Sequence, residues 1–580
     1  MPGSPLFPPA APAGARRLSA RGITRVLSLR GALGLTRVDG ALLFAVRAAL
    51  AMALPALPIA LAGRPGTAVY AMLGAFTTTF GRNLAYRRRA RVLALVALAM
   101  TAAVGGGSAL AVWADPRSGG WGAAVVVAAT ALVAGAAKFA CDAARLSGLG
   151  AVLLLFSFAV AANSTPTWAD VLPQTTAAAV GAATAWALSL AGRLWHPDRP
   201  QRLAVAAALR ALADLVETAP GTAAHTRARH RATAAVLGAY GTLGTEPPTA
   251  GERGVRGGVP LRLTDLSWSL LIRSAHRPPG DPAALAVRLR SQVRLLTTRR
   301  GGAPVLLARL SVSAGPVTVR APLPPAGAVG RRTAELLGGH TRRLGVFAVP
   351  ALRMTLGTGV AGALALALGL GHGYWAAIAA AAVLHSVNVR TTAQRALQRT
   401  LGTLAGLGIA VAVLATGPGP VALVLVIVLL EFLLEYFVVR NYALGVVFVT
   451  PLALLMSELA TPAAAEGLVL DRGLGSLLGI ALGLLCALVV VHDRAAVRVE
   501  HALSACTEAA EAAERSLRER PGTGPGRPAV QVRLAAALVE LREAEDAAAG
   551  ELWEAGVDPA VLAAGEQRAY LLLDRFLHGG

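Results

Sequence analysis

Long runs of apolar residues that carry almost no charge recur along both halves of the chain. A helix needs about 20 largely apolar residues to cross a hydrocarbon layer of ~30 Å. Twelve stretches approach that length and predict transmembrane helices: 41–62, 67–80, 92–113, 121–137, 146–163, 175–190, 346–370, 374–389, 401–416, 421–439, 442–456 and 468–491. The shorter stretches have an alternative interpretation, as re-entrant or interfacial helices.

These stretches divide the chain into five segments and predict an all-α polytopic membrane protein. The segments are a disordered, basic N-terminus (1–40), a first six-span repeat (41–192), a basic region (193–345), a second six-span repeat (346–491) and an acidic helical C-terminus (492–580). The start of the chain is rich in Pro and Ala, and its arginines precede any long apolar run. That order is not typical of a secretory signal peptide.

Charged and glycine residues match between the two apolar segments, which predicts an internal repeat. Arg47 and Arg353 are 306 residues apart, and Gly181 and Gly479 are 298 apart. An even number of spans in each half gives both copies the same orientation. Transporters built from such parallel repeats usually place the substrate path at the repeat interface.

Arginines are concentrated in alternate loops, which predicts the orientation of the chain in the membrane. Loops that follow the second, fourth and sixth spans of each half are basic, whereas the loops between them are short and almost free of positive charge. We therefore expect a multi-pass protein of the plasma (inner) membrane with both termini and the middle region in the cytoplasm.

The amino-acid composition argues against several classes of function. Only 15% of the residues are charged, mean hydropathy is +0.57, and the net charge of +23 comes almost wholly from arginine. Lys138 is the sole lysine and lacks the glycine framework of a phosphate-binding loop, so ATP is not expected to drive this protein. The three cysteines are isolated in sequence. We therefore expect no cofactor, no metal and no enzymatic activity.

The two regions outside the apolar segments carry opposite charge. Residues 193–343 hold 23 arginines against 8 acidic residues, a net of +15, and residues 500–580 hold 8 against 14, a net of −6. We expect the acidic region to dock on the basic one through contacts that salt screens. Attraction of the basic region to anionic lipid is the simplest account of its charge. No nucleic-acid-binding motif is present, so no nucleic-acid partner is expected.

Two segments of the second half resemble a known family. Residues 395–406 read RALQRTLGTLAG, and residues 441–455 read NYALGVVFVTPLALL after Arg440. They are similar to signature segments of the fusaric acid resistance–like family, which includes aromatic acid exporters. The resemblance implies two six-span blocks with cytoplasmic regions, and efflux of acids such as fusaric and hydroxybenzoic acid. The family-motif residues in this chain are Gly402, Gly406, Arg440, Asn441, Tyr442, Thr450 and Pro451.

Three arginines inside or next to apolar stretches are candidate substrate-binding residues. Arg47 and Arg353 lie within the first span of each half, and Arg399 lies where the third span of the second half begins. A guanidinium binds a carboxylate through two parallel hydrogen bonds. The alternative for Arg47 and Arg353 is snorkelling to the membrane surface, and for Arg399 a headgroup anchor.

Glu431 and Glu435 are the carboxylates that lie deepest in an apolar stretch, and they are candidates for proton coupling. Their spacing of four residues puts them on one helix face. Burial and mutual repulsion favour the protonated form of such a pair. The alternative is a structural ion pair with an arginine of a neighbouring helix. Asp471 and Arg472 are expected near the outer face, paired locally or in water.

These observations favour a membrane exporter of small organic, chiefly aromatic, acid anions that is driven by the proton gradient. A passive anion channel and a non-transporting envelope or scaffold protein are the alternatives. The expected partners are a small organic anion and the lipid bilayer, and a homo-oligomer is left open.

Overall fold

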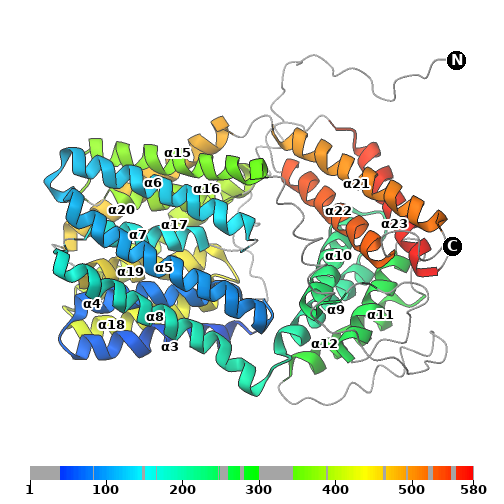
Figure 1. The fold of residues 1–580 in the computed structure, drawn as a ribbon, viewed down its shortest axis with the longest axis horizontal. Coiled ribbons are helices and arrows are strands. Elements are labelled where there is room, and N and C mark those ends of the chain that lie inside the picture. The colour runs from blue at the N-terminus through cyan, green and yellow to red at the C-terminus, as the bar shows by residue number, and fades with distance from the viewer. Residues whose placement is uncertain are drawn as a thin grey trace.

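A computed structural model describes residues 40–82, 84–144, 146, 150–164, 166–245, 247, 259–274, 280–298, 344–371, 373–386, 389–460, 465–490, 494–519, 527–549 and 557–578. Every regular element among them is a helix. The helices gather in two bodies, a transmembrane block and a smaller bundle of amphipathic helices (Figure 1). The expected disordered N-terminus, 1–39, and the part of the basic region at 299–343 lie outside the described residues.

The transmembrane block contains helices from both apolar segments of the chain. The first segment forms α3 (Ala41–Leu61), α4 (Pro65–Ala75), the 3₁₀ turn η1 (Phe76–Thr79), α5 (Tyr86–Ala114), the 3₁₀ turn η2 (Pro116–Ser118), α6 (Gly120–Ala143), α7 (Gly150–Ala162) and α8 (Trp168–Trp195). The second forms α15 (Leu344–Ala367), α16 (Tyr374–Leu384), α17 (Val389–Leu414), α18 (Pro420–Phe437), α19 (Tyr442–Ala460) and α20 (Ala465–Val490).

Nine helices in the described part of the chain are long and apolar enough to cross a membrane, which confirms a polytopic membrane protein. Twelve complete spans, and hence two six-span repeats, are not confirmed. The helices α4, α7 and α16 have 11, 13 and 11 residues. At a rise of 1.5 Å per residue, 11 residues cover only ~16 Å, about half of the hydrocarbon layer.

The short helices α4 and α16 form the centre of the transmembrane block. Residues 68–75 of α4 and 375–384 of α16 are all buried, so these helices have no face toward lipid. A helix that is apolar on every side lies either in a protein core or in a bilayer, and here the neighbouring helices bury it. At the end of α4 the backbone tightens into η1 and then becomes extended at Phe80. Interrupted helices of this kind in membranes occur where protein or a cavity covers the backbone.

Helix contacts correspond between the two halves. The outer helix α3 packs on α18 of the other half, and α15 packs on α6. A Cβ added at Gly181 of α8 would lie 1.9 Å from the carbonyl oxygen of Ala71 in α4. The same change at Gly479 of α20 would bring it to 2.1 Å from the carbonyl oxygen of Ala376 in α16. These matched close contacts favour the repeat, which stays a prediction.

The second body, which we call the amphipathic domain, combines the basic and the acidic regions of the chain. Its helices are α9 (Arg199–Glu217), α10 (Ala223–Leu243), α11 (Val259–Ser274), α12 (Pro282–Thr297), α21 (Arg494–Arg518), α22 (Arg527–Ala548) and α23 (Pro559–His578). One apolar core joins both regions. Within it, the hydroxyl groups of Thr233 and Tyr570 lie 2.9 Å apart. The expected docking therefore occurs, but through apolar burial and not chiefly through charge, because each region exposes an unpartnered apolar face without the other.

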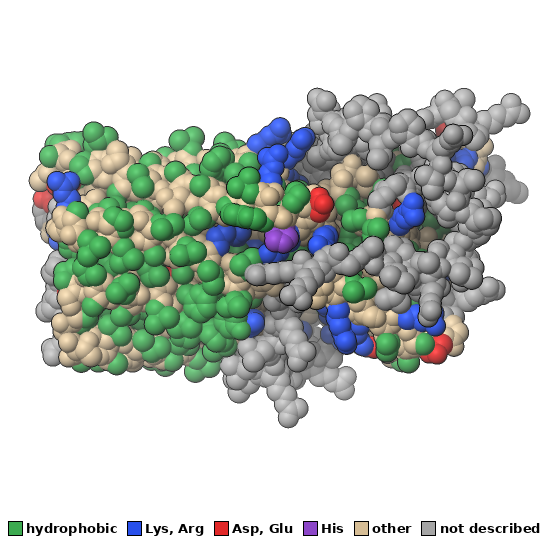
Figure 2. All heavy atoms as spheres, turned by 90° about the horizontal axis from the view of Figure 1, so that it is seen from below, with side chains coloured by type: hydrophobic (Ala, Val, Ile, Leu, Met, Phe, Trp, Pro, Cys, Tyr) green, Lys and Arg blue, Asp and Glu red, His purple; other side chains and the backbone are tan. Residues whose placement is uncertain are grey.

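The surface differs between the two bodies. Figure 2 shows hydrophobic side chains covering the transmembrane block on one face, with Lys and Arg side chains gathered where this block meets the amphipathic domain. Large exposed side chains such as Leu54, Leu95 and Leu132 belong to the outer helices of the block. Such a surface is stable in contact with lipid, whereas exposed apolar patches of this extent are rare on proteins in water.

Candidate functional site

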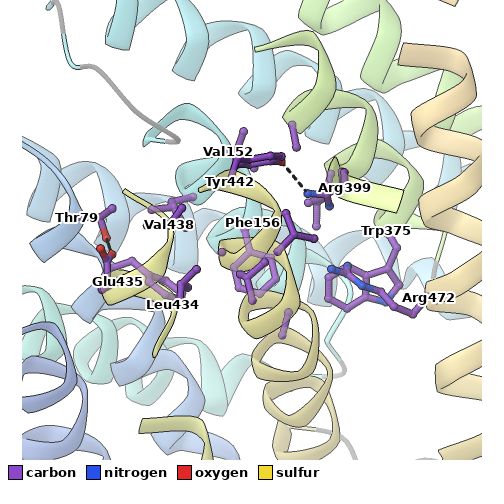
Figure 3. A pocket seen from close by; sticks show the side chains of 18 residues that line it. Thr79, Val152, Phe156, Trp375, Arg399, Leu434, Glu435, Val438, Tyr442 and Arg472 are labelled. Carbon is purple, nitrogen blue, oxygen red and sulfur yellow. Dashed lines mark hydrogen bonds between the residues drawn. The ribbon is translucent and has the colours of Figure 1, made fainter. Parts of the chain in front are cut away.

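A cavity of about 80 Å³ lies between the two halves of the transmembrane block. Its wall is mostly apolar and is built by η1 and α7 from the first half and by α16 to α20 from the second. The polar residues of the wall are Thr79, Arg399, Glu435, Tyr442 and Arg472 (Figure 3). A small number of polar groups in an apolar cavity is the usual composition of a small-molecule site.

Arg472 of α20 is buried at this cavity, with 2% of its surface exposed. Its guanidinium carbon lies 3.8 Å from the ring centroid of Trp375 in α16 (Figure 3). The Nε and Nη1 atoms are buried and have no hydrogen-bond partner among the described residues. The alternative that Arg472 is in contact with water is therefore wrong. Its expected place near the outer face stays a prediction, because Arg472 lies three residues after the start of the candidate span Val469–Val489.

Arg399 of α17 is the second guanidinium at the cavity and is 4% exposed. Its Nη1 donates a hydrogen bond of 3.5 Å to the hydroxyl of Tyr442 (Figure 3), while its buried Nε has no partner within the described chain. Arg399 is also an electrostatic neighbour of Arg472. Two buried like charges repel each other, and an anion between them would relieve both the repulsion and the unmet hydrogen bonding.

Glu435 of α18 lines the cavity at the end away from Arg472 (Figure 3). Its Oε1 accepts a hydrogen bond of 2.9 Å from the hydroxyl of Thr79 in η1. Glu431 lies one turn earlier on α18, is 1% exposed and is not part of the cavity wall. The Oε2 atom of Glu431 has no hydrogen-bond partner among the described residues. The two carboxylates thus have different surroundings although they share a helix face.

Arg47 and Arg353 are not part of the cavity wall. The Nη2 atom of Arg353 donates to the carbonyl oxygens of Leu384 and Ser386, at 2.9 and 2.7 Å, where α16 ends. The guanidinium carbon of Arg47 lies 4.7 Å from the ring centroid of Phe44. The structure therefore places these two matched arginines in different environments.

The family-motif residues lie on α17, on α19 and in the loop before α19. A Cβ at Gly402 or Gly406 would lie 2.7 Å from an atom of α19, so these glycines permit close packing of the two helices. Asn441 accepts a hydrogen bond of 2.7 Å from the backbone of Ala443. The remaining motif residues are Arg440, which lies 3.7 Å over the Tyr436 ring, Tyr442 at the cavity, and the buried Thr450 and Pro451.

Three residues at the cavity, Thr79, Trp375 and Arg472, were not identified from the sequence as site residues. Arg472 had a detectable signal, because an arginine within an apolar stretch of 24 residues is costly unless it has a role. Thr79 and Trp375 had none, since threonine and tryptophan are ordinary residues of transmembrane helices. Within the described residues, no group of three or more His, Cys, Asp or Glu side chains could hold a metal ion.

Comparisons with known proteins agree with a membrane protein. Residues 360–486 match the family model described as fusaric acid resistance protein-like, which confirms the resemblance seen at 395–406 and 441–455. The chain is 26% identical over 558 residues to YvaC, an uncharacterized membrane protein of Bacillus subtilis (strain 168). That alignment covers 91% of this chain and 84% of the relative. No solved structure matches this chain.

Proposed function

We propose that this protein exports small organic anions across the plasma (inner) membrane, with the substrate bound in the cavity between the two halves. One observation carries the proposal: Arg399 and Arg472 are buried beside an apolar cavity, and each has N–H donors without a partner in the described chain. Unpaired buried donors cost about 1–3 kcal/mol each, and more when the group is charged. A bound carboxylate would remove that cost.

The wall of the cavity supports an aromatic or otherwise apolar acid as the substrate. Phe156 and Trp375 stack with their ring centroids 6.1 Å apart, and Leu434 and Val449 add apolar contacts. The carboxylate would lie at Arg472 and Arg399 and the ring against these side chains. A cavity of about 80 Å³ is smaller than the ~150 Å³ cavity that accommodates benzene in an engineered protein. The substrate would therefore have a single ring, and binding would widen the cavity.

Glu435 is the carboxylate best placed to couple the proton gradient to export. It lines the same cavity, and its partner Thr79 lies on the interrupted segment that follows α4. Interrupted helices near the midplane form the substrate and ion sites of many secondary transporters. Glu431 is a second proton-binding candidate one turn away. Arg353 would have a positioning role, because its bonds to Leu384 and Ser386 fix the end of the helix that carries Trp375.

Flux of benzoate in proteoliposomes tests the proposal. The intact protein should move benzoate, and Arg472→Gln and Arg399→Gln should each reduce the initial rate by roughly tenfold or more, since a charge-assisted hydrogen bond contributes about 1.5–3 kcal/mol. Arg64→Gln is the matched control, because Arg64 is exposed in the loop between α3 and α4. Full flux in both cavity variants would refute the assignment of the cavity as the substrate site.

The same preparation separates the alternatives. Sustained currents carried by benzoate in planar bilayers at equal pH on both sides would favour a passive anion channel. Absence of flux and of current, together with unchanged tolerance of a deletion strain to weak organic acids, would favour a scaffold protein of the envelope. Uphill export that follows an imposed pH gradient is the result that the exporter proposal requires.

A further inference from the structure

A second group of arginines lies near the end of η1, outside the cavity wall. We call Arg47, Arg82 and Arg89 the arginine cluster. The guanidinium carbons of Arg47 and Arg82 lie 4.7 and 4.1 Å from the ring centroid of Phe44, which is 5% exposed. Arg89, on α5, is an electrostatic neighbour of Arg47. Three positive charges thus share one small region in which Arg89 is buried and Arg47 and Arg82 are half-buried.

Hydrogen bonding within the arginine cluster is unequal. Arg89 donates to the carbonyl oxygens of Gly81, Arg82 and Ser189, at 3.2, 2.5 and 3.5 Å, so its guanidinium is held by the backbone. In contrast, both Nη atoms of Arg82 and the Nε of Arg47 are buried and have no partner among the described residues. Arg89 therefore fixes the backbone at Gly81 and Arg82, whereas the side chains of Arg47 and Arg82 keep N–H donors for another group.

The balance of charge also points to an anion. Glu435 is the carboxylate that attracts both Arg47 and Arg82, and its Oε1 is already bonded to Thr79. Within the described part of the chain, one carboxylate against three guanidinium groups leaves a partly buried surplus of positive charge, which is expensive without a counter-charge. An oxyanion with several acceptor atoms would meet the charge and the unmet N–H groups together.

Arg47 lies at the boundary between the buried side and the lipid-facing side of α3. It shares a helix face with the buried Phe44 and Ala51 and also with the exposed Leu43 and Leu50, at 40 and 46%. The contact of its guanidinium with the Phe44 ring and its buried Nε atom show that part of the side chain faces the protein.

We infer that Arg47 and Arg82 form a second oxyanion site, for a carboxylate or a phosphate, which is separate from the Arg399–Arg472 cavity. Glu435 borders both sites, since it lines the cavity and is the electrostatic neighbour of both cluster arginines. An anion at the arginine cluster would therefore compete with Glu435 for the same positive charges. This inference goes beyond the proposed function and can fail or hold independently of it.

Equilibrium dialysis of radiolabelled benzoate against the full-length protein in phosphatidylcholine nanodiscs tests the inference. The unmodified protein should bind two benzoate ions per chain. Arg47→Gln and Arg82→Gln should each remove one ion and leave the other unchanged. Arg88→Gln, at an exposed arginine beside the cluster, is the matched control and should keep both. Unchanged binding in both cluster variants would overturn the inference.

Further variants separate this inference from the proposed function. Arg472→Gln should remove the cavity ion and leave the cluster ion, so a loss restricted to Arg472→Gln would support the cavity and overturn the cluster site. A loss restricted to Arg47→Gln and Arg82→Gln would support the cluster site and overturn the cavity as a binding site. If Arg82→Gln fails to fold, Arg82→Lys serves in its place, because it keeps the charge without the planar fork. This variant should lower the affinity for the cluster ion by roughly tenfold. Unchanged affinity in Arg82→Lys would overturn the site.

The source of the oxyanion is decided by the lipid. In phosphatidylglycerol nanodiscs, loss of the cluster ion with retention of the cavity ion would identify a lipid phosphate as the group that Arg47 and Arg82 bind. Retention of both benzoate ions would identify a free anion from solution. Both results require the same two guanidinium groups. The variants Arg47→Gln and Arg82→Gln must therefore bind equal numbers of benzoate ions in the two lipids.

Discussion

The guanidinium carbon of Arg472 lies 3.8 Å from the ring centroid of Trp375, and both side chains are buried in the transmembrane block. A desolvated cation over an indole ring is stabilised by about 2 kcal/mol or more. The stacking therefore offsets part of the cost of burying this charge. It also leaves N–H groups at the edge of the guanidinium available to a ligand in the cavity.

Removal of the indole should weaken anion transport. We expect Trp375→Leu to lower the initial rate of benzoate flux in proteoliposomes by up to roughly thirtyfold, because the loss of ~2 kcal/mol leaves Arg472 poorly positioned. Trp121→Leu is the control, since Trp121 is 79% exposed at the start of α6. Equal flux in the two variants would show that the stacking has no part in substrate binding.

The two buried glutamates should differ in their effect on proton coupling. We expect Glu435→Gln to abolish uphill export driven by a pH gradient while downhill exchange of benzoate persists, because glutamine retains the shape but cannot ionise. Glu431→Gln should reduce coupling less, since Glu431 is outside the cavity wall. Export assays in vesicles with and without a pH gradient measure both. A defect confined to Glu431→Gln would contradict this order.

Close packing of α17 against α19 should make Gly406 sensitive to a single added methyl group. A Cβ there would lie 2.7 Å from Cβ of Thr450 and 2.8 Å from the carbonyl oxygen of Val447. We expect Gly406→Ala to destabilise the protein by about 1–3 kcal/mol, measured by thermal unfolding in detergent. Gly408→Ala on the same helix, with nothing within 4 Å, should be neutral or stabilising by up to ~1 kcal/mol. Equal unfolding temperatures for the two variants would exclude the packing role.

Association of the basic and acidic parts of the amphipathic domain should resist salt. Because one apolar core joins them, we expect separately expressed 193–345 and 492–580 to remain bound in a pull-down as NaCl rises from 0.05 M to about 1 M, where the Debye length is ~3 Å. Tyr570→Ala removes a buried ring of that core and should separate the fragments at every salt concentration. Dissociation by salt alone would support charge as the main attraction.

Acid should destabilise the amphipathic domain through His225. Burial lowers the pKa of His225 below its ordinary value. Its Nε2 lies 2.9 Å from Nη2 of Arg229, a contact that requires an unprotonated Nε2. A depressed folded-state pKa means that the unfolded chain binds more protons below pH ~6.5, so stability is full above that pH and falls as pH decreases.

A variant series checks this pH dependence. The unfolding temperature of the amphipathic domain should fall between pH 7.5 and 5.5, and His225→Gln should flatten that dependence. The exposed His501 provides the control, and His501→Gln should keep the slope of the unmodified protein. An identical slope in His225→Gln would exclude His225 as the origin.

Much of the architecture could be predicted from local sequence, because it depends on windows of about 20 residues. The apolar stretch that became α18 predicted both a span and the burial of Glu431 and Glu435. The glycines Gly402 and Gly406 predicted close helix packing, which α19 provides. Hydropathy could not separate a complete span from a buried half-span, so α4 and α16 were predicted too long. Their burial depends on the surrounding helices and not on their own composition.

The site depended on contacts between residues distant in sequence. Thr79 and Glu435 are 356 residues apart, and no local pattern indicates their hydrogen bond. The sequence by itself determined that this is an arginine-rich membrane protein with few buried charges and a segment similar to the fusaric acid resistance family. Tertiary structure decided that Arg472 faces the cavity, that Arg353 bonds to backbone, and that Arg47 lies beside Arg82. The physical reason is that hydropathy is a property of a short segment, whereas the partners of a buried charge are supplied by whichever helices pack around it.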